Sequence, residues 1–280
     1  MTPDLPARSH ARPVGRITRG KTARNRLRGS DHFLVHYDPA LLTRRTAGFA
    51  GAMCVDLGYG AEPHTTLEWA DRLRAHVPGL PVLGVEIEPG RVASALPHAD
   101  AATGFRLGGF NLPLQDGEQV RLVRAFNVLR QYDESEVVPA WTLLTSQLLP
   151  GGLLIDGTSG PLGRTWTACL VRRPETGEAP WELEALVLGL NLRRGFEPDL
   201  VPARLPKAFI HRNVPGEPVH AFLTAWQRAA LETRPLSVWG ARQHFAAAAA
   251  HLAGQGFDAV LRPRWLKQGW LVWRRPPVPA

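Results

Sequence analysis

The residues best suited to chemistry in this 280-residue sequence form one short turn, Asp56-Leu57-Gly58-Tyr59-Gly60. An acid ends an apolar run, and glycines follow at alternate positions. Such a turn before a helix lets the backbone approach a nucleotide at the carboxyl edge of a parallel sheet. Pro63 stands where a dinucleotide fingerprint has its third glycine, and it removes an N–H that a diphosphate would use. Because Asp56 precedes the glycines, the turn predicts a ligand with a cationic amino-acid part and no diphosphate.

The elements around this turn alternate between apolar runs and helical patterns. Strands are expected near 52–57, 81–86, 105–107, 122–126 and 153–156. Alternation of this kind implies right-handed crossovers and a parallel sheet. Two further strands, 165–171 and 183–190, lack a helix between them and suit an antiparallel hairpin. We therefore predict a Rossmann-like, doubly wound α/β fold. Its mostly parallel sheet has seven strands with an antiparallel edge hairpin, and a C-terminal α+β addition follows.

The net charge of +8 is unevenly distributed. Residues 1–30 carry eight basic groups and one acid, residues 31–192 carry 12 basic groups and 19 acids, and residues 193–280 carry 13 basic groups and five acids. We divide the chain accordingly into a basic arm, a ligand-binding domain and a basic C-terminal addition of two helices and a hairpin (259–261 with 270–273) packed on the core. Basic flanks favour a polyanionic partner such as nucleic acid, and docking of the flanks on the acidic centre is the alternative.

Several classes of protein are disfavoured. The two cysteines, Cys54 and Cys169, lie in apolar runs and are expected to be buried free thiols in a reducing compartment. No apolar run approaches the ~18 residues of a membrane span, and no secretory signal begins the chain, so we predict a cytoplasmic protein without a membrane partner. The histidines show no metal-ligand spacing, and no metal site is predicted. Gly15 to Thr22 fits the letters of a phosphate-binding loop but lacks the strand before it and the helix after it.

Beyond these patterns, the sequence resembles the class I S-adenosylmethionine-dependent methyltransferases over about residues 50–192. The turn after the first strand resembles the first motif of that family, and the second strand ends as its second motif does. The matching stretches are Val55–Gly60, Gly84–Pro89, Asn111–Leu114, Ala125–Leu129 and Leu149–Leu154. Three further stretches resemble an uncharacterised bacterial subgroup: Gly15–Arg28, Asn127–Tyr132 and Leu205–Gly216.

The resemblance implies that S-adenosylmethionine is the cofactor. In that family the first acid helps to hold the methionine amino group, the glycines admit the methionine part, and the second acid accepts from the ribose hydroxyls. The acid that usually follows the third strand is missing here, and Gly109 or Asn111 occupies its region. The implied cofactor-binding residues are Asp56, Gly58, Tyr59, Gly60, Glu86, Asn111 and Asn127.

The acceptor is less defined. Methyl transfer from a sulfonium is an in-line displacement in which the protein positions the nucleophile and removes its proton. The family's adenine-N6 signature is absent, because Val128 and Leu129 follow Asn127. We therefore take Asn127 and Tyr132 as candidate catalytic residues, with a helix cap and a core phenol as alternative roles. The predicted function is methyl transfer to nucleic acid, ahead of a small-molecule acceptor. The alternative is a catalytically inactive methyltransferase-like protein that binds nucleic acid.

Overall fold

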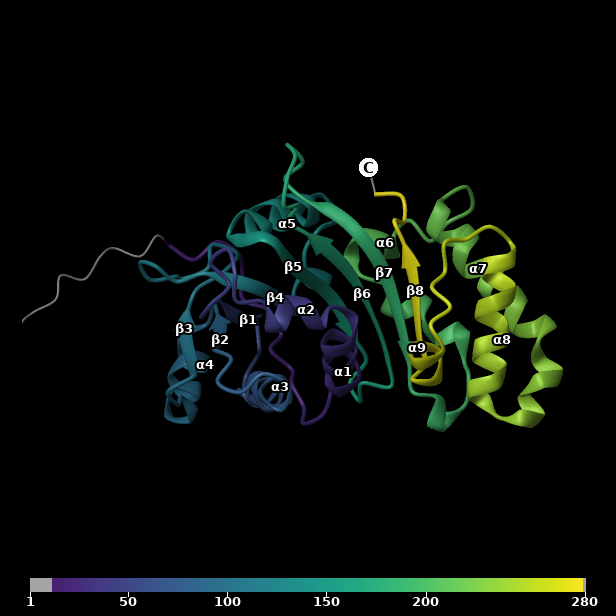
Figure 1. Ribbon diagram of the computed structural model, residues 1–280, viewed down its shortest axis with the longest axis horizontal. Helices are drawn as coiled ribbons and strands as arrows, with labels where there is room; N and C mark the ends of the chain where they lie inside the picture. Colours follow the sequence, from purple (N-terminus) through teal and green to yellow (C-terminus); the bar gives the residue numbers. More distant parts are fainter. Residues whose placement is uncertain (1–11, 279–280) are drawn as a thin grey trace, which may run out of the picture.

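The computed structural model describes residues 12–278, and its centre is one twisted sheet. Within the described residues the sheet has eight strands in the order β3-β2-β1-β4-β5-β6-β7-β8 (Figure 1). The first five strands pair in parallel, and β6, β7 and β8 continue the sheet in antiparallel pairing. The strands are β1 (Met53–Leu57), β2 (Val82–Glu86), β3 (Thr103–Leu107), β4 (Val120–Phe126), β5 (Leu148–Ser159), β6 (Thr165–Arg172), β7 (Glu182–Leu190) and β8 (Trp270–Arg274).

The predicted Rossmann-like fold with an antiparallel edge is confirmed, and the sheet has one strand more than expected. The extra strand, β8, comes from the C-terminal part of the chain and pairs with β7 from Gly189 to Ala185. The expected hairpin with 259–261 is reduced to one isolated bridge between Ala259 and Trp273. The sheet therefore continues across the boundary that the charge distribution suggested at residue 193.

Helices cover both faces of the sheet, which is why its strands read as nearly continuous apolar runs. Along β1, Val55 packs in the core cluster under α5 to α8, whereas the adjacent Cys54 packs in the cluster under α1, α2 and α3. No helix among residues 12–278 has the length and apolar character to cross a membrane. The α-helices are α1 (Arg28–Tyr37), α2 (Pro39–Thr43), α3 (His64–Arg74), α4 (Pro89–Ala95), α5 (Val137–Ser146), α6 (Lys207–Ile210), α7 (Pro218–Glu232), α8 (Ala241–Gly254) and α9 (Pro263–Lys267).

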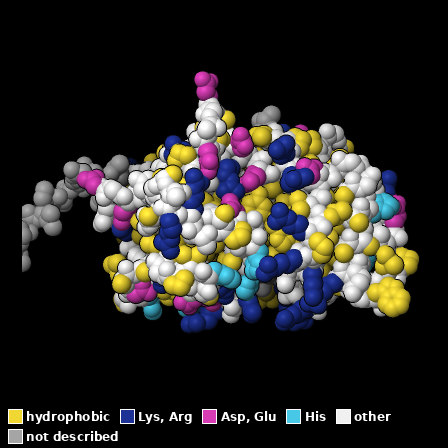
Figure 2. Space-filling view, viewed as in Figure 1, with side chains coloured by type: hydrophobic (Ala, Val, Ile, Leu, Met, Phe, Trp, Pro, Cys, Tyr) yellow, Lys and Arg dark blue, Asp and Glu magenta, His cyan; other side chains and the backbone are white. Residues whose placement is uncertain are grey.

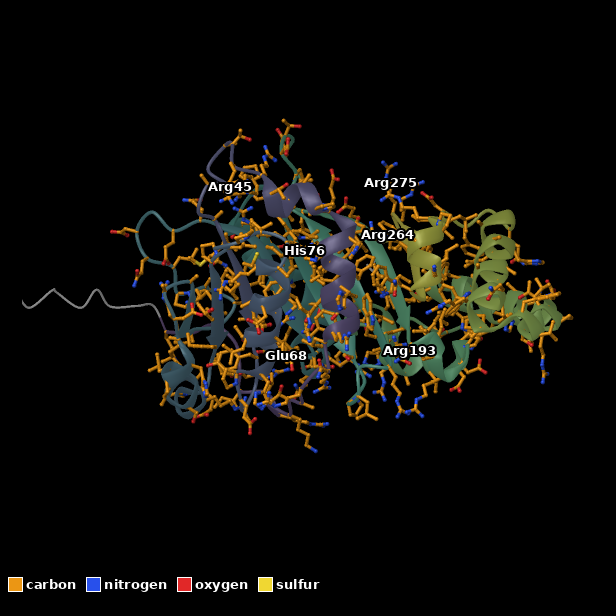
Figure 3. All side chains as sticks on the ribbon, turned by 60° about the horizontal axis from the view of Figure 1, so that its bottom comes forward. Arg45, Glu68, His76, Arg193, Arg264 and Arg275 are labelled. Atoms are coloured by element: carbon orange, nitrogen blue, oxygen red, sulfur yellow. The ribbon has the colours of Figure 1, made fainter. Side chains whose placement is uncertain are left out.

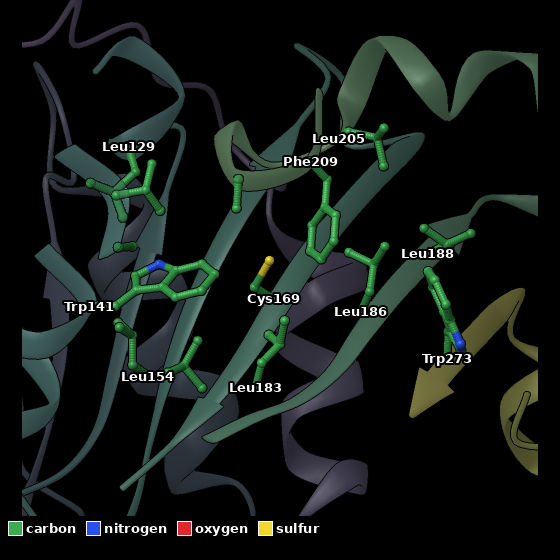
Figure 4. Packing of buried hydrophobic residues seen from close by; sticks show 14 of the residues in the cluster. Leu129, Trp141, Leu154, Cys169, Leu183, Leu186, Leu188, Leu205, Phe209 and Trp273 are labelled. Atoms are coloured by element: carbon green, nitrogen blue, oxygen red, sulfur yellow. The ribbon is translucent and has the colours of Figure 1, made fainter. Parts of the chain in front are cut away.

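Both cysteines are buried and free, as predicted. The Cys169 side chain points into the larger core, between the indole of Trp141 and the ring of Phe209 (Figure 4). Burial raises the pKa of the Cys54 thiol to about 12. A thiol in such surroundings stays protonated and unreactive, so neither cysteine serves as a nucleophile.

Candidate active site

The turn after β1 has the conformation that its glycines permit. Gly58 has a φ of +69° and Gly60 a φ of +94°, in the left-handed region that disfavours other residues. A Cβ on Gly58 would lie 2.6 Å from Cγ2 of Val128, and a Cβ on Gly60 would lie 2.6 Å from the carbonyl oxygen of Gly20. The second contact means that the backbone approaching Gly60 in this structure belongs to the chain's own N-terminal part.

Residues 12–26, here called the edge segment, cross the carboxyl edge of the parallel strands. At the β3 end, the amide of Phe110 donates to the carbonyl of Val14 at 2.8 Å. The amide of Val14 in turn donates to Oδ1 of Asn111 at 2.6 Å. A side chain at Gly109 would clash with the Val14 carbonyl. The side chain of Asn111, predicted to bind the cofactor, is thus hydrogen-bonded to the edge segment.

The middle of the edge segment is fixed in the same way. The amide of Arg16 donates to the Tyr132 hydroxyl at 2.7 Å, and that hydroxyl donates to the Arg16 carbonyl at 3.2 Å. Further along, the amide of Ala61 donates to the carbonyl of Gly20 at 2.8 Å. Tyr132 is only 4% exposed, and burial raises the pKa of its phenol. In this conformation its hydroxyl is engaged by backbone groups.

Asp56 lies at the predicted edge, but its carboxylate is paired internally. Its Oδ2 lies 2.7 Å from Nη2 of Arg124, and its Oδ1 accepts from Nε at 3.0 Å. The hydroxyls of Thr65 and Thr66 also donate to Oδ2, at 3.2 and 2.8 Å. Because the side chain is 2% exposed, this carboxylate first of all balances a buried guanidinium.

The partner of Asp56 was not anticipated from the sequence. Arg124 is fully buried in β4 and also pairs with Asp31 of α1, at 2.5 Å. Burial alone would lower the pKa of Arg124, but the two carboxylates raise it above its usual value. A charged residue inside the apolar run 120–126 was the available signal. The two acids that pair with Arg124, Asp56 and Asp31, lie 68 and 93 positions away in the chain.

Glu86 ends β2 beside the glycine turn. Its Oε2 accepts from the amide of Gly60 at 3.0 Å, and its Oε1 accepts from the amide of Ile87 at 3.0 Å. Nη1 of Arg91 lies 3.4 Å from Oε1. The carboxylate is 1% exposed, so it is held at the edge by the turn that it faces.

Tyr59 and Asn127 occupy different surroundings at this edge. The Tyr59 ring is buried edge-on against Phe105, with centroids 5.4 Å apart, so only its backbone borders the turn. Asn127 directly follows β4 and has a φ of +61°, an uncommon value for a residue with a side chain. Its Oδ1 accepts from the amide of Ser159 at 3.0 Å. Strained backbone of this kind is found at functional sites, where the surrounding structure holds it.

Two cavities remain between the edge segment and the sheet. The larger, here called the edge cavity, has a volume of about 200 Å³ and is lined by the glycine turn, Asp56, Asn127 and residues 18–22. The hydroxyl of Thr22 on its wall is buried and has no hydrogen-bond partner among the described residues. The smaller cavity, of about 20 Å³, lies beside Glu86 and Tyr132.

These volumes test the fit of S-adenosylmethionine. A cavity of about 20 Å³ holds about one water molecule, whereas ligand pockets measure about 300–1,000 Å³. The donor set suits the cofactor, since an acid ends β2 and the unpartnered hydroxyl belongs to a residue on the wall of the edge cavity. The space does not suit it while the edge segment lies there. In this conformation the cofactor does not fit, and the edge segment is the reason.

The fold defines a Rossmann-like α/β protein, and the carboxyl edge after β1 and β2 is its candidate ligand site. All the predicted site residues lie at this carboxyl edge: Asp56, Gly58, Tyr59, Gly60, Glu86, Asn111, Asn127 and Tyr132. No group of three or more His, Cys, Asp or Glu side chains in residues 12–278 is arranged to hold a metal ion. Of the Gly15–Thr22 stretch, residues 18–22 line the edge cavity as part of the edge segment, and α1 begins only at Arg28.

No protein-family model and no curated protein matches the chain. Solved structures with a similar fold include the methyltransferase in complex with the Haloferax volcanii Trm112 activator, at 21% identity over 49% of this chain and 60% of that chain, with a TM-score of 0.30. The CcbJ methyltransferase from Streptomyces caelestis is 18% identical over 56% of this chain and 70% of its own, with a TM-score of 0.35. Human N-acetylserotonin methyltransferase, solved with S-adenosylmethionine, is 19% identical over 49% and 42%, with a TM-score of 0.31.

The chain thus spans between about two fifths and seven tenths of the length of these three proteins. Because their TM-scores lie below 0.5, the fold class is defined by the strand order and pairing of this chain itself.

Proposed function

We propose that this protein transfers a methyl group from S-adenosylmethionine, in a state in which the edge segment has moved off the sheet. The observation that carries the proposal is the pairing of the glycine turn after β1 with Glu86 at the end of β2. The amide of Gly60 donates to the Glu86 carboxylate at 3.0 Å. A carboxylate at that point can accept from two neighbouring hydroxyls of a ribose once the local donors are exchanged.

Residues at the end of β4 would serve the acceptor. The candidate catalytic groups are the Asn127 amide, on the wall of the edge cavity, and the Tyr132 hydroxyl. When the edge segment leaves, Tyr132 loses both of its partners from Arg16 and becomes free to orient a nucleophile. Transfer by in-line displacement requires positioning above all, and a hydroxyl and an amide can supply it.

For the acceptor, we propose nucleic acid ahead of a small metabolite. The support is the charge of the two flanks: 1–30 has eight basic groups against one acid, and 193–280 has 13 against five. Basic surfaces of this kind raise the local concentration of polyanions.

A second candidate function is a methyltransferase-like protein that binds nucleic acid and has lost transfer. The occupied edge favours this second candidate. Residues 14–20 are hydrogen-bonded across the carboxyl edge, where the adenosine of the proposed cofactor would bind. The absence of an acid in the loop 108–111 points the same way.

Calorimetry with S-adenosylmethionine separates the two candidates. We expect binding by the full chain, and tighter binding by a variant that lacks residues 2–24. Transfer of labelled methyl groups from the cofactor into fractionated lysate then identifies the acceptor class. If neither protein binds the cofactor while both remain folded by circular dichroism, the enzyme is excluded and the inactive alternative stands.

A further inference from the structure

A second concave surface lies on the opposite side of residues 25–29 from the edge cavity. This basic groove has a volume of about 400 Å³ and runs between α1, α9 and the loop that follows β7, with the start of α8 at one end. Where α1 faces α9, Lys, Arg and His side chains gather on the surface (Figure 2). Five cationic side chains line the groove: Arg28, Arg193, Arg242, Arg264 and Lys267.

These five charges have no internal counter-charges. Each residue is exposed, and none of the five side chains makes an ion pair or hydrogen bond with another residue in 12–278. No Asp or Glu lines the groove. The charges come from four separate parts of the chain, so the fold brings them together in spite of their repulsion. A cleft lined by one sign of charge focuses its field and concentrates anions.

Aromatic side chains complete the walls. The rings open to a ligand are those of His32, which is exposed, and His36, which is half-buried. Trp166 and Trp270 also border the groove but are buried, at 3% and 5% exposed, and the rings of His36 and Trp270 have centroids 6.0 Å apart. Rings interleaved with cations are typical of surfaces that hold single-stranded nucleic acids, where cations follow the backbone and bases stack on ring faces. Four of the five cations are arginines, whose planar forks match phosphate oxygens.

We propose that the basic groove binds the phosphodiester backbone of a single-stranded nucleic acid. A bilayer surface is flat and does not follow a concavity of this size, which disfavours lipid headgroups as the ligand. An acidic peptide would supply single carboxylates but no bases to stack on the His32 and His36 rings. The groove is open while the edge segment is docked, so this binding can be measured without the cofactor.

The position of the groove also bears on the acceptor. Arg26 and Leu27 line the edge cavity, whereas Asn25, Arg28 and Gly29 line the groove. The two spaces therefore share the chain between residues 25 and 29 as a wall. A strand in the groove would lie next to the edge cavity, and on the proposed function it would be the acceptor.

The test is fluorescence anisotropy with fluorescein-labelled oligo-U and oligo-dT of about 12 nucleotides, a length typical of single-strand sites, without S-adenosylmethionine. The informative variant is Arg193→Gln/Arg264→Gln. The matched variant Arg45→Gln/Arg275→Gln removes the same charge from exposed positions outside the groove (Figure 3). We expect the wild type to bind with a logarithmic salt slope of up to about −3.5 for five cations. The groove variant should lower the slope by about 1.4 and weaken binding by about 25-fold at about 0.1 M salt.

Three results would overturn the proposal. They are an equal loss in both double variants, a salt slope near zero, and a groove-dependent preference for vesicles containing phosphatidylserine. The comparison of oligo-U with oligo-dT decides between RNA and DNA, and either one supports the proposal. Because the cofactor is absent from the assay, failure here leaves calorimetry with S-adenosylmethionine as a separate test of the proposed function.

Discussion

Loosening the edge segment should tighten cofactor binding, and Arg16→Ala is the cleanest perturbation. The Arg16 guanidinium lies 2.8 Å from Oε2 of Glu136, and its Cζ lies 4.3 Å from the ring centroid of Tyr132. The ion pair is exposed, so it contributes about 0.2–1 kcal/mol, and the cation–π contact adds about 0.5–1 kcal/mol. Together they stabilise the docked segment by about 1–2 kcal/mol.

This energy converts directly into an affinity. If the docked state dominates, the apparent Kd for S-adenosylmethionine equals the intrinsic Kd divided by the open fraction. Removing about 1–2 kcal/mol raises the open fraction by about 5- to 30-fold and lowers the apparent Kd by the same factor. Calorimetry at constant salt measures it. Arg24→Ala is the matched control, because Arg24 is an exposed residue of the same segment with no ion pair to residues 12–278.

Hydrogen exchange supplies an independent readout of the opening. The amide of Phe110 donates to the Val14 carbonyl, so it should exchange faster in Arg16→Ala than in Arg24→Ala. The reasoning is refuted if this amide exchanges faster while the affinity for S-adenosylmethionine stays constant or falls. The edge segment would then be a wall of the cofactor site that binding requires, and not a competitor for the space.

Two further predictions concern the buried charges. Burial raises the pKa of Asp156 to about 7, and the indole N–H of Trp141 donates to its carboxylate at 3.1 Å. Between about pH 4 and 7 the folded state therefore keeps a proton on Asp156 that the unfolded state has lost. The free energy of unfolding should therefore fall by up to ~4 kcal/mol as the pH rises across that range. In urea titrations, the free energy of unfolding of Asp156→Asn should equal that of the wild type at pH 4 and exceed it at pH 8. Equal free energies at both pH values would contradict the assignment. Arg124→Met leaves the buried Asp56 carboxylate without a cationic partner and leaves Asp31 with Arg72 alone, at 2.6 Å, so it should cost about 3–5 kcal/mol in the same assay. Arg45→Gln on the surface should cost less than about 0.5 kcal/mol, and a loss in Arg124→Met no larger than that would contradict the buried network.

The sequence was sufficient for the parallel half of the fold. Strands β1, β2, β4 and β5 are apolar runs that end in an acid, an amide or a turn, so a local pattern contains both the strand and its edge. β8 was harder, because Trp270–Arg274 reads as one half of a local hairpin and only the open edge of β7 makes it the eighth strand. Whether a strand pairs with a local or a distant partner depends on tertiary packing, and strand propensity alone does not decide it.

The candidate site was predictable in position but not in bonding. Residue types placed Asp56 and Glu86 at one edge, where the structure has them. That Asp56 balances Arg124 depends on contacts far apart in the chain, and no short-range pattern encodes it. The edge segment docks mainly through backbone groups of Val14, Arg16 and Gly20. Because every residue type carries a backbone carbonyl, the sequence of this segment contains no sign of the docking. A substitution of Asp56 would thus report on folding before it reported on the cofactor.

The chain between residues 18 and 29 borders both proposed sites, and this has a measurable consequence. Residues 18–22 and 26–27 line the edge cavity, whereas Asn25, Arg28 and Gly29 line the basic groove. If a nucleic acid in the groove displaces this stretch, it changes the affinity for S-adenosylmethionine. By linkage, the cofactor must then change the affinity for the nucleic acid by the same factor. Coupling of this kind is typically 5- to 150-fold, so anisotropy with saturating cofactor and calorimetry with saturating oligo-U should give equal ratios. Two ratios equal to one would mean that the shared wall is rigid, and that the two sites act independently.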